Sequence, residues 1–164
     1  MTIARMGRSV LLFGLLAASL AWSSASHAAE PDCKGQQGEV RLFVIIENVR
    51  SHDGLIDVTV YPDEPQRFLK RGGPIRGLSG VTANAGPPVT RMCLWLPSPG
   101  AYAISVYHDA NGNHDFDQNF IGLPTEGFGF SNNPTLIVGP PSFEAARFLV
   151  KGDSTITIRL RYVG

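Results

Sequence analysis

The chain has 164 residues, with 14 Lys and Arg, 14 Asp and Glu, 18 Gly, 12 Pro and 2 Cys. This length predicts one domain, and a hydrophobic content of 43% suffices for a packed core, which excludes a wholly disordered chain. Because basic and acidic residues are equal in number, the chain is not expected to have the concentrated basic face that phosphate binding needs. No nucleic acid is therefore expected as a partner.

The first 28 residues have the pattern of a cleaved signal peptide. Arg5 and Arg8 precede an apolar run over residues 10–21, and Ser26-His27-Ala28 offers small residues for cleavage before Ala29. A membrane anchor is the alternative, but the run is shorter than the roughly 20 residues that span a bilayer. We therefore expect no membrane span in the mature chain.

Cleavage divides the chain into three predicted parts. These are a signal peptide (1–28), an N-terminal arm (29–37) and a β-sandwich domain (38–164). Loss of two basic residues leaves 12 basic and 14 acidic residues, a net charge of −2. Cys33 and Cys93 both remain, and the oxidising compartment of an exported protein favours a disulfide between them over two free thiols.

Alternation of apolar and polar residues dominates the mature chain and predicts about seven short strands. The segments that alternate are 40–46, 56–60, 91–96, 102–107, 148–150 and 156–162. Helical patterns are limited to a turn or two near 66–71 and one turn at 143–147. Strands of this length with one apolar face predict an all-β fold, an Ig-like β-sandwich of two sheets. Tyr102 is placed to return its hydroxyl to the backbone at a corner of the sandwich.

One segment carries oxygen ligands at every second position. The side chains are Asp109, Asn111, Asn113, Asp115, Asp117 and Asn119. Calcium takes six to eight hard oxygens, several of them carboxylates, so calcium is a possible cofactor. The match to a helix-loop-helix calcium loop fails at two places, because the turn glycine is Gly112 and Phe120 replaces the bidentate glutamate. Glu126 is the candidate for the missing carboxylate.

Regional charge agrees with a cation site, since no Lys or Arg lies between Arg91 and Arg147. The alternative is that the same Asp, Asn and Gly residues form unliganded turns. If these side chains surround a calcium ion, Asp109→Ala and Asp115→Ala should each abolish the stabilisation that calcium gives and leave the stability of the metal-free protein unchanged or higher, because each removes a like charge from an acidic cluster. His108 and His114 raise zinc as a further alternative, although two histidines six residues apart form a weak pattern.

Residues 120–134 read as an irregular, glycine-rich loop. Phe120, Phe128 and Phe130 predict that this loop is ordered and folded back on the sandwich, or that their rings line a ligand groove.

The residues from 102 to 134, with 96–100 upstream and 141–148 downstream, resemble a bacterial family of exported proteins of unknown function, family 2141. The most specific matches are His108-Asp109-x-Asn111-Gly112-Asn113 and Gly122-x-Pro124-x-Glu126-Gly127-x-Gly129. The resemblance implies a Gram-negative exported protein, periplasmic or secreted, with a sandwich like those of transthyretin-like and carboxypeptidase-regulatory domains. It implies no reaction, and the two cysteines are not part of the family pattern.

Three functions compete. The first is a binding module for an envelope protein or small ligand, with a cation ordering the loop. The second is a metal-assisted periplasmic hydrolase that uses His108, Asp109 and Glu126. The third is a purely structural envelope protein. No G-x-S-x-G, H-E-x-x-H or phosphate-binding loop is present, so we expect that the chain is not an enzyme.

Overall fold

The computed structural model describes residues 32–137 and 139–163, and the predicted signal peptide therefore lies outside the described residues. Within this part of the chain there are eight strands, one 3-10 helix and one short α-helix. Their bounds are β1 Val40–Glu47, β2 Leu55–Pro62, η1 Pro65–Arg67, β3 Val81–Asn84, β4 Val89–Leu96, β5 Gly100–Asp109, β6 Gly127–Phe130, α1 Phe143–Ala146, β7 Phe148–Val150 and β8 Ser154–Arg159.

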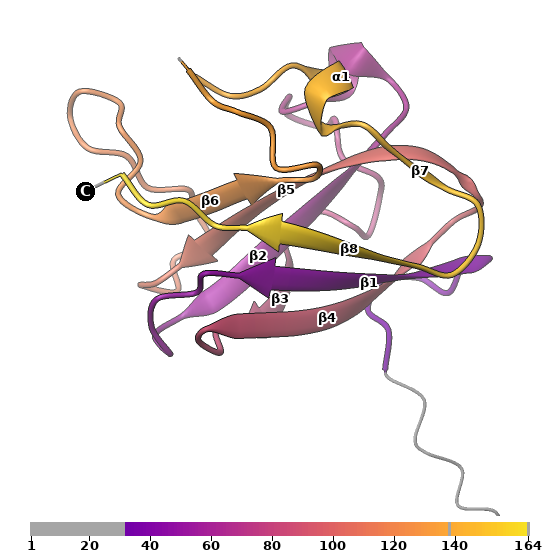
Figure 1. Ribbon diagram of the computed structural model, residues 1–164, viewed down its shortest axis with the longest axis horizontal. Coiled ribbons are helices and arrows are strands. Elements are labelled where there is room, and N and C mark those ends of the chain that lie inside the picture. The colour runs from indigo at the N-terminus through magenta and orange to yellow at the C-terminus, as the bar shows by residue number, and fades with distance from the viewer. Residues whose placement is uncertain (1–31, 138, 164) are drawn as a thin grey trace, which may run out of the picture. The chain divides into compact units, whose positions relative to one another are not determined.

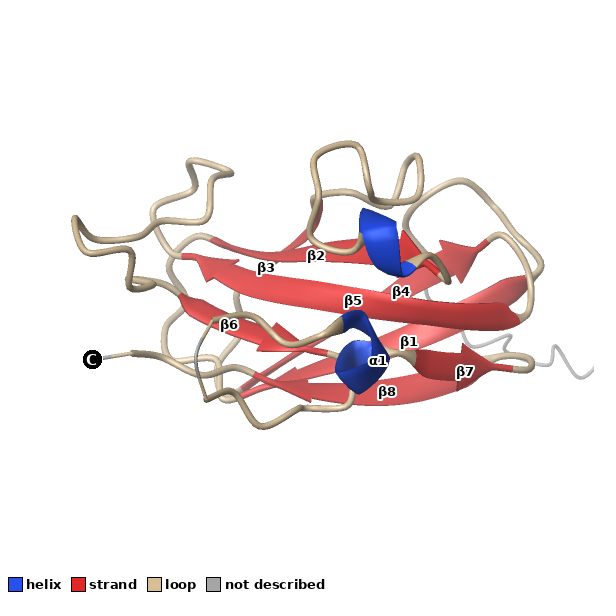
Figure 2. Cartoon of the chain, turned by 90° about the horizontal axis from the view of Figure 1, so that it is seen from above, coloured by secondary structure: helices blue, strands red, loops and turns tan. Residues whose placement is uncertain are grey.

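The strands form two sheets that face each other (Figures 1 and 2). One sheet has the order β4-β1-β8, and the other has the order β3-β2-β5-β6, with β7 also paired to β5. The β1–β8 pair is parallel and the other strand pairs are antiparallel. This arrangement confirms the predicted two-layered all-β fold, with eight strands where about seven were expected. None of the described helices is long and apolar enough to cross a membrane.

The main core lies between the two sheets and follows the alternation seen in the sequence. Side chains at the even positions of residues 40–46 in β1, 56–60 in β2 and 102–108 in β5 point inward and are fully or almost fully buried. The inward residues with no exposed surface include Leu42, Val44, Ile46, Ile56, Val58, Val60, Leu94, Leu96, Ile104 and Ile158. Burial of the apolar faces of the two sheets against one another is the dominant source of stability in such a sandwich.

A second, aromatic cluster covers the outer face of the five-stranded sheet. Phe68, which follows η1, contacts Tyr61, Phe130 and Phe143 edge to face at ring-centroid distances of 5.2, 6.3 and 5.8 Å. Figure 2 shows both short helices on this face of the sheet. Phe143 begins α1, whose N-cap Ser142 accepts a hydrogen bond from Ala145 N at 3.3 Å.

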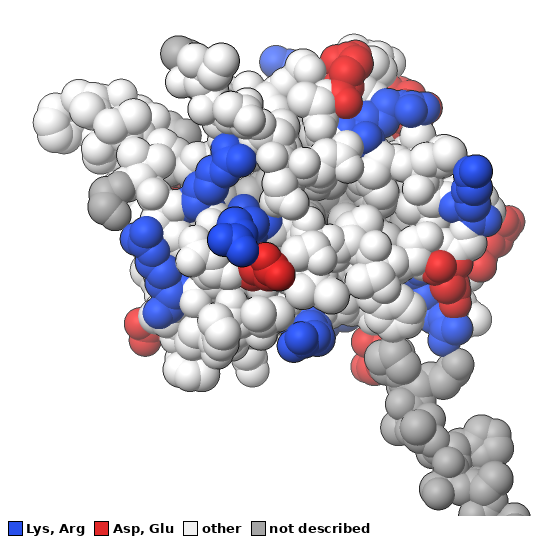
Figure 3. Space-filling view, in the orientation of Figure 1, with Lys and Arg blue, Asp and Glu red and all other residues white. Residues whose placement is uncertain are grey.

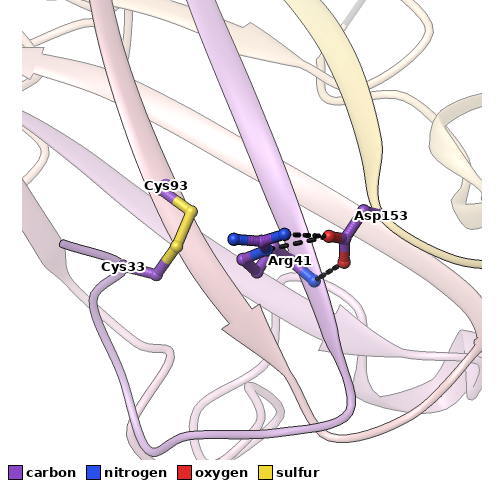
Figure 4. The surroundings of a disulfide bond; sticks show 4 residues. All are labelled: Cys33, Arg41, Cys93 and Asp153. Carbon is purple, nitrogen blue, oxygen red and sulfur yellow. Dashed lines mark hydrogen bonds and ion pairs between the residues drawn. A yellow bond between two sulfur atoms is a disulfide. The ribbon is translucent and has the colours of Figure 1, made fainter. Parts of the chain in front are cut away.

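The N-terminal arm is attached to the three-stranded sheet. Cys33 and Cys93 form the predicted disulfide, and Lys34 adds a parallel bridge beside β4. In Figure 4 the Arg41 side chain lies between this disulfide and Asp153, to which it donates through Nε at 2.8 Å. The predicted corner is also confirmed, because the Tyr102 hydroxyl donates to Ser98 O at 2.6 Å.

The sequence-based assignment of residues 120–134 as a loop was wrong over residues 127–130, which form strand β6. Gly127 and Gly129 occupy its inward positions, where a Cβ atom would lie 2.3 Å from Tyr162 and 2.8 Å from Ile158. Phe128 and Phe130 therefore take the outward positions. This inverts the usual apolar-inward alternation, so the pattern resembled a loop.

Candidate functional site

The longest connection that contains no helix joins two strands that are already neighbours. β5 ends at Asp109, β6 begins at Gly127, and the two strands pair antiparallel with His108 opposite Gly127. The connecting residues 110–126, called here the β5–β6 loop, project from the end of the sandwich where β5 ends (Figure 1). All predicted metal ligands lie in this loop or at its base.

Asp109 organises the first turn of the loop from a fully buried position. Its Oδ1 accepts the backbone N–H groups of Gly112 at 2.8 Å and Asn113 at 3.1 Å. Its Oδ2 accepts the backbone N–H of His114 at 2.8 Å. Three charge-assisted hydrogen bonds compensate the burial of this carboxylate. The sequence-based expectation about Asp109→Ala considered only repulsion between like charges, whereas the structure shows that this carboxylate also accepts three backbone N–H groups.

Glu126 ties the end of the loop back to its beginning. Its Oε1 accepts the backbone N–H of Ala110 at 3.2 Å, and its Oε2 accepts that of Asp117 at 3.1 Å. Burial raises the pKa of Glu126, and this effect outweighs the two backbone hydrogen bonds, which favour the ionised form. Glu126 is therefore near the other predicted ligands, as expected, but it acts as a clamp on the backbone.

The remaining four predicted ligands form a chain of hydrogen bonds along the loop. Asn111 Oδ1 accepts from Asn113 N at 3.0 Å, and Asn113 Oδ1 accepts from Asp115 N at 2.8 Å. The side-chain amides of Asn111 and Asn113 both donate to Asp117 Oδ2, at 2.7 and 3.1 Å. Among the residues described, no three His, Cys, Asp or Glu side chains are grouped so that they could hold a metal ion. The loop thus brings the predicted ligands into one network, without drawing its carboxylates together.

His108 faces the interior, and both of its ring nitrogens have partners. Nε2 lies 2.8 Å from the carbonyl oxygen of Asp53, so Nε2 carries a proton and donates it to this carbonyl. Nδ1 is hydrogen-bonded to the Tyr162 hydroxyl at 2.9 Å. The ring is buried in this bridging position, and it does not point toward the β5–β6 loop ligands as the zinc alternative requires.

Sequence reasoning missed a buried carboxylate beside the loop. Asp57 on β2 lies opposite Tyr107 on β5, and its side chain is hydrogen-bonded to the Tyr107 and Thr59 side chains. Burial raises the pKa of Asp57 to about 6, against the lowering effect of the Tyr107 hydrogen bond. Burial and the nearby Asp57 charge also raise the pKa of Tyr107. Alternation placed Asp57 on the outer face, which is correct, but strand pairing was needed to show that Tyr107 covers it.

The aromatic residues of the loop do not share one environment. Phe116 contacts Tyr107 and Phe128 edge to face, at 5.7 and 5.8 Å between ring centroids. Phe120, in contrast, is 99% exposed, so the expectation that it folds back on the sandwich was wrong. The Phe and Gly residues of this segment do not alternate with polar residues, so the sequence does not indicate which phenylalanine rings pack against the sandwich and which are exposed.

Comparison with known proteins places the chain in a family. No curated protein and no solved structure matches it significantly. The relationship to transthyretin-like domains therefore stays a prediction. A family model described as "Uncharacterized protein conserved in bacteria (DUF2141)" matches residues 44–158, which span β1 to β8 and include the β5–β6 loop. The chain therefore belongs to this bacterial DUF2141 family.

Proposed function

We propose that this protein is an exported bacterial binding module whose β5–β6 loop contacts an envelope protein or small ligand. The observation that carries this proposal is the loop itself. Neighbouring antiparallel strands need only a two-residue turn, whereas β5 and β6 are joined by residues 110–126. Long ordered loops on a rigid β-scaffold are commonly the functional part of such domains.

The internal order of the loop supports binding over mere connection. Asp109 and Glu126 are both buried, and together they accept five backbone N–H groups of the loop. A loop that is ordered before it meets a ligand loses less conformational entropy on binding. A test is alanine replacement of exposed loop residues, followed by affinity capture from a periplasmic extract. Loss of one identified partner would support the proposal, and a capture profile that is identical for all variants would contradict it.

Export is supported by the N-terminal sequence pattern and by the disulfide. A bond between Cys33 and Cys93 suits an oxidising compartment such as the periplasm. The mature protein should begin near Ala29 and be recovered from the periplasmic or secreted fraction. N-terminal sequencing decides this, and material that begins at Met1 in a membrane fraction would contradict it.

We also propose that calcium binds the loop, because the donor set consists of carboxylate and amide oxygens. Asp117 Oδ2 accepts the side-chain amide groups of Asn111 and Asn113, so a bound cation would need both amides to turn and present their oxygens instead. Side chains that would hold the ion are Asp109, Asn111, Asn113, Asp115, Asp117 and Glu126. Asp109 Oδ2 accepts one backbone N–H and so keeps acceptor capacity. A bound calcium ion would stabilise the loop by neutralising its carboxylates.

Calcium binding is tested by the melting temperature with about 10 mM calcium against excess chelator, since sites of this kind have dissociation constants of roughly 0.1–1 mM. Mass action then stabilises the protein by about 1.4 to 2.7 kcal/mol. Asp117→Asn should remove the gain, whereas Glu144→Gln, an acid outside the loop, should keep it. Magnesium should substitute poorly because it demands closer, octahedral ligands. Equal melting temperatures with calcium and with chelator would contradict calcium binding and mean that the Asp and Asn side chains serve only to form the turns of the loop.

A catalytic role is not proposed. The hydrolase alternative needs His108, Asp109 and Glu126 to act on a substrate, but His108 bridges Asp53 and Tyr162, and the two carboxylates hold backbone N–H groups. An activity screen with divalent metals tests this, and turnover that Glu126→Gln abolishes would favour the enzyme.

A further inference from the structure

The outermost turn of the β5–β6 loop exposes three large apolar side chains. Phe120 is 99% exposed, Ile121 64% and Leu123 45%. We call these three residues the apolar tip. Large side chains of this kind are normally withdrawn from water, and a cluster of them on a projecting loop marks an interaction site.

The tip is held by Asn119 in a tight turn. Asn119 Oδ1 accepts the backbone N–H groups of Ile121 at 3.1 Å and Leu123 at 3.0 Å. The backbone of the turn closes on itself, because Asn119 N donates to Leu123 O at 2.8 Å and Gly122 N donates to Asn119 O at 2.9 Å. The three apolar side chains are therefore presented by an ordered turn, so little ordering entropy is lost when they are buried.

The tip also has few of the groups that resist transfer into an apolar medium. No charged residue occurs between Asp117 and Glu126. The N–H groups of Asn119, Ile121, Gly122 and Leu123 are all bonded within the turn, and Pro124 has none. An unsatisfied backbone N–H is costly in hydrocarbon, so these internal bonds suit a lipid environment. Figure 3 shows the projecting lobe on the side of β6 with no Lys, Arg, Asp or Glu on the visible face.

We propose that the apolar tip inserts into the interfacial region of a lipid bilayer and docks the sandwich on a membrane surface. The proposal rests on the binding role proposed for the β5–β6 loop, but not on calcium. A convex tip that offers side-chain apolar area and few free backbone groups matches a bilayer better than a protein groove, which ordinarily supplies polar contacts as well. Asp115 and Asp117 precede the tip in the chain, and anionic lipid would repel their carboxylates. The attraction between the tip and the bilayer is therefore hydrophobic and does not depend on anionic lipid.

The test is sedimentation of the mature protein with phosphatidylcholine–phosphatidylethanolamine vesicles, in chelator and at both low and high salt. We expect reversible binding that salt leaves unchanged. Phe120→Ser should lower the partition coefficient by at least about tenfold, because one large apolar side chain no longer leaves water. Since Phe120 is exposed, this variant should fold as the parent does, which circular dichroism checks.

Leu149→Ser is the matched control. Leu149 is 59% exposed on β7, which pairs with the beginning of β5, whereas the loop follows its end. This variant should bind vesicles as the parent does. A Phe120→Trp variant should show a blue-shifted emission on vesicles that brominated acyl chains quench, which places the side chain among lipids.

Three outcomes would overturn the proposal. The first is that the parent does not bind vesicles, and the second is that Phe120→Ser leaves vesicle binding unchanged. The third is a dimer in solution that Phe120→Ser dissociates, because a second copy of the chain would then cover the tip. A protein that captures a periplasmic partner through the β5–β6 loop but does not bind vesicles would keep the proposed function of the loop and lose this inference alone.

Discussion

The carboxylate of Asp109 accepts the backbone N–H of His114, five residues further along the chain, at 2.8 Å. Together with the bonds from Gly112 and Asn113, this contact makes a buried side chain at the end of β5 the centre of the turn that follows. The pattern that suggested calcium ligands is thus also the pattern of a carboxylate-capped turn. The two roles predict different effects of substitution in the absence of metal.

Asp109→Ala should destabilise the protein in chelator by about 2 to 3 kcal/mol, because three backbone N–H groups lose a charged acceptor. Asp109→Asn, which keeps one oxygen, should cost less. Asp115→Ala is the control, since the Asp115 carboxylate has an exposed position, and it should change stability by less than about 0.5 kcal/mol. Urea denaturation measures all three. Equal stabilities of the Asp109→Ala and Asp115→Ala variants would contradict the capping role.

Gly127→Ala should destabilise the protein by about 1 to 3 kcal/mol, because a methyl group there overpacks the interior. Its Cβ would lie 2.3 Å from the ring of Tyr162, which also holds His108. The control is Gly152→Ala, where a Cβ meets no atom within 4 Å and the backbone does not have a left-handed φ. Thermal denaturation compares the two variants, and equal melting temperatures would mean that β6 moves outward without cost.

Reduction of the Cys33–Cys93 disulfide should lower stability by up to roughly 4 kcal/mol, the chain-entropy value for a sequence separation of 60 residues. The strands should persist, because β1 pairs with β4 along its whole length without the arm. Urea denaturation with and without reductant measures the loss, and far-ultraviolet circular dichroism follows the strands. The same midpoint in both conditions would show that the bond does not constrain the unfolded chain.

The sequence predicted the strands whose alternation places apolar residues inward, such as β1 and β5, because burial against a second sheet produces that pattern directly. It failed at β6, where glycine faces the core and phenylalanine faces outward. In the loop, Asp109 and Asn111 were predicted as calcium ligands and are found accepting hydrogen bonds from the loop backbone, because hydrogen bonding to backbone and coordination of a cation use the same residue types. The burial of Asp57 depends on its pairing with Tyr107, a contact between segments far apart in sequence.

Asp57 makes stability depend on pH in a direction that its position dictates. The folded protein keeps the Asp57 proton up to about pH 6, because burial, aided by the nearby Asp109 charge, outweighs the hydrogen bonds from Tyr107 and Thr59 and the nearby charge of His114, which all lower the pKa. The unfolded chain releases it near the ordinary aspartate pKa of 3.8. Between these values the folded state binds more protons, so the contribution of Asp57 to the free energy of unfolding falls as the pH rises from about 4 to about 6.

Asp57→Asn removes this titration. The stability of the variant relative to the parent should therefore rise by up to about 3 kcal/mol between about pH 4 and pH 7, and stay level above that. Asp63→Asn is the control with the opposite sign, since a hydrogen bond from Arg147 lowers the pKa of the exposed Asp63 carboxylate. That variant should lose stability relative to the parent as the pH rises through the low-pH range. Urea denaturation across the pH series measures both differences, and an Asp57→Asn difference that is constant with pH would show that Asp57 is ionised in the folded protein throughout.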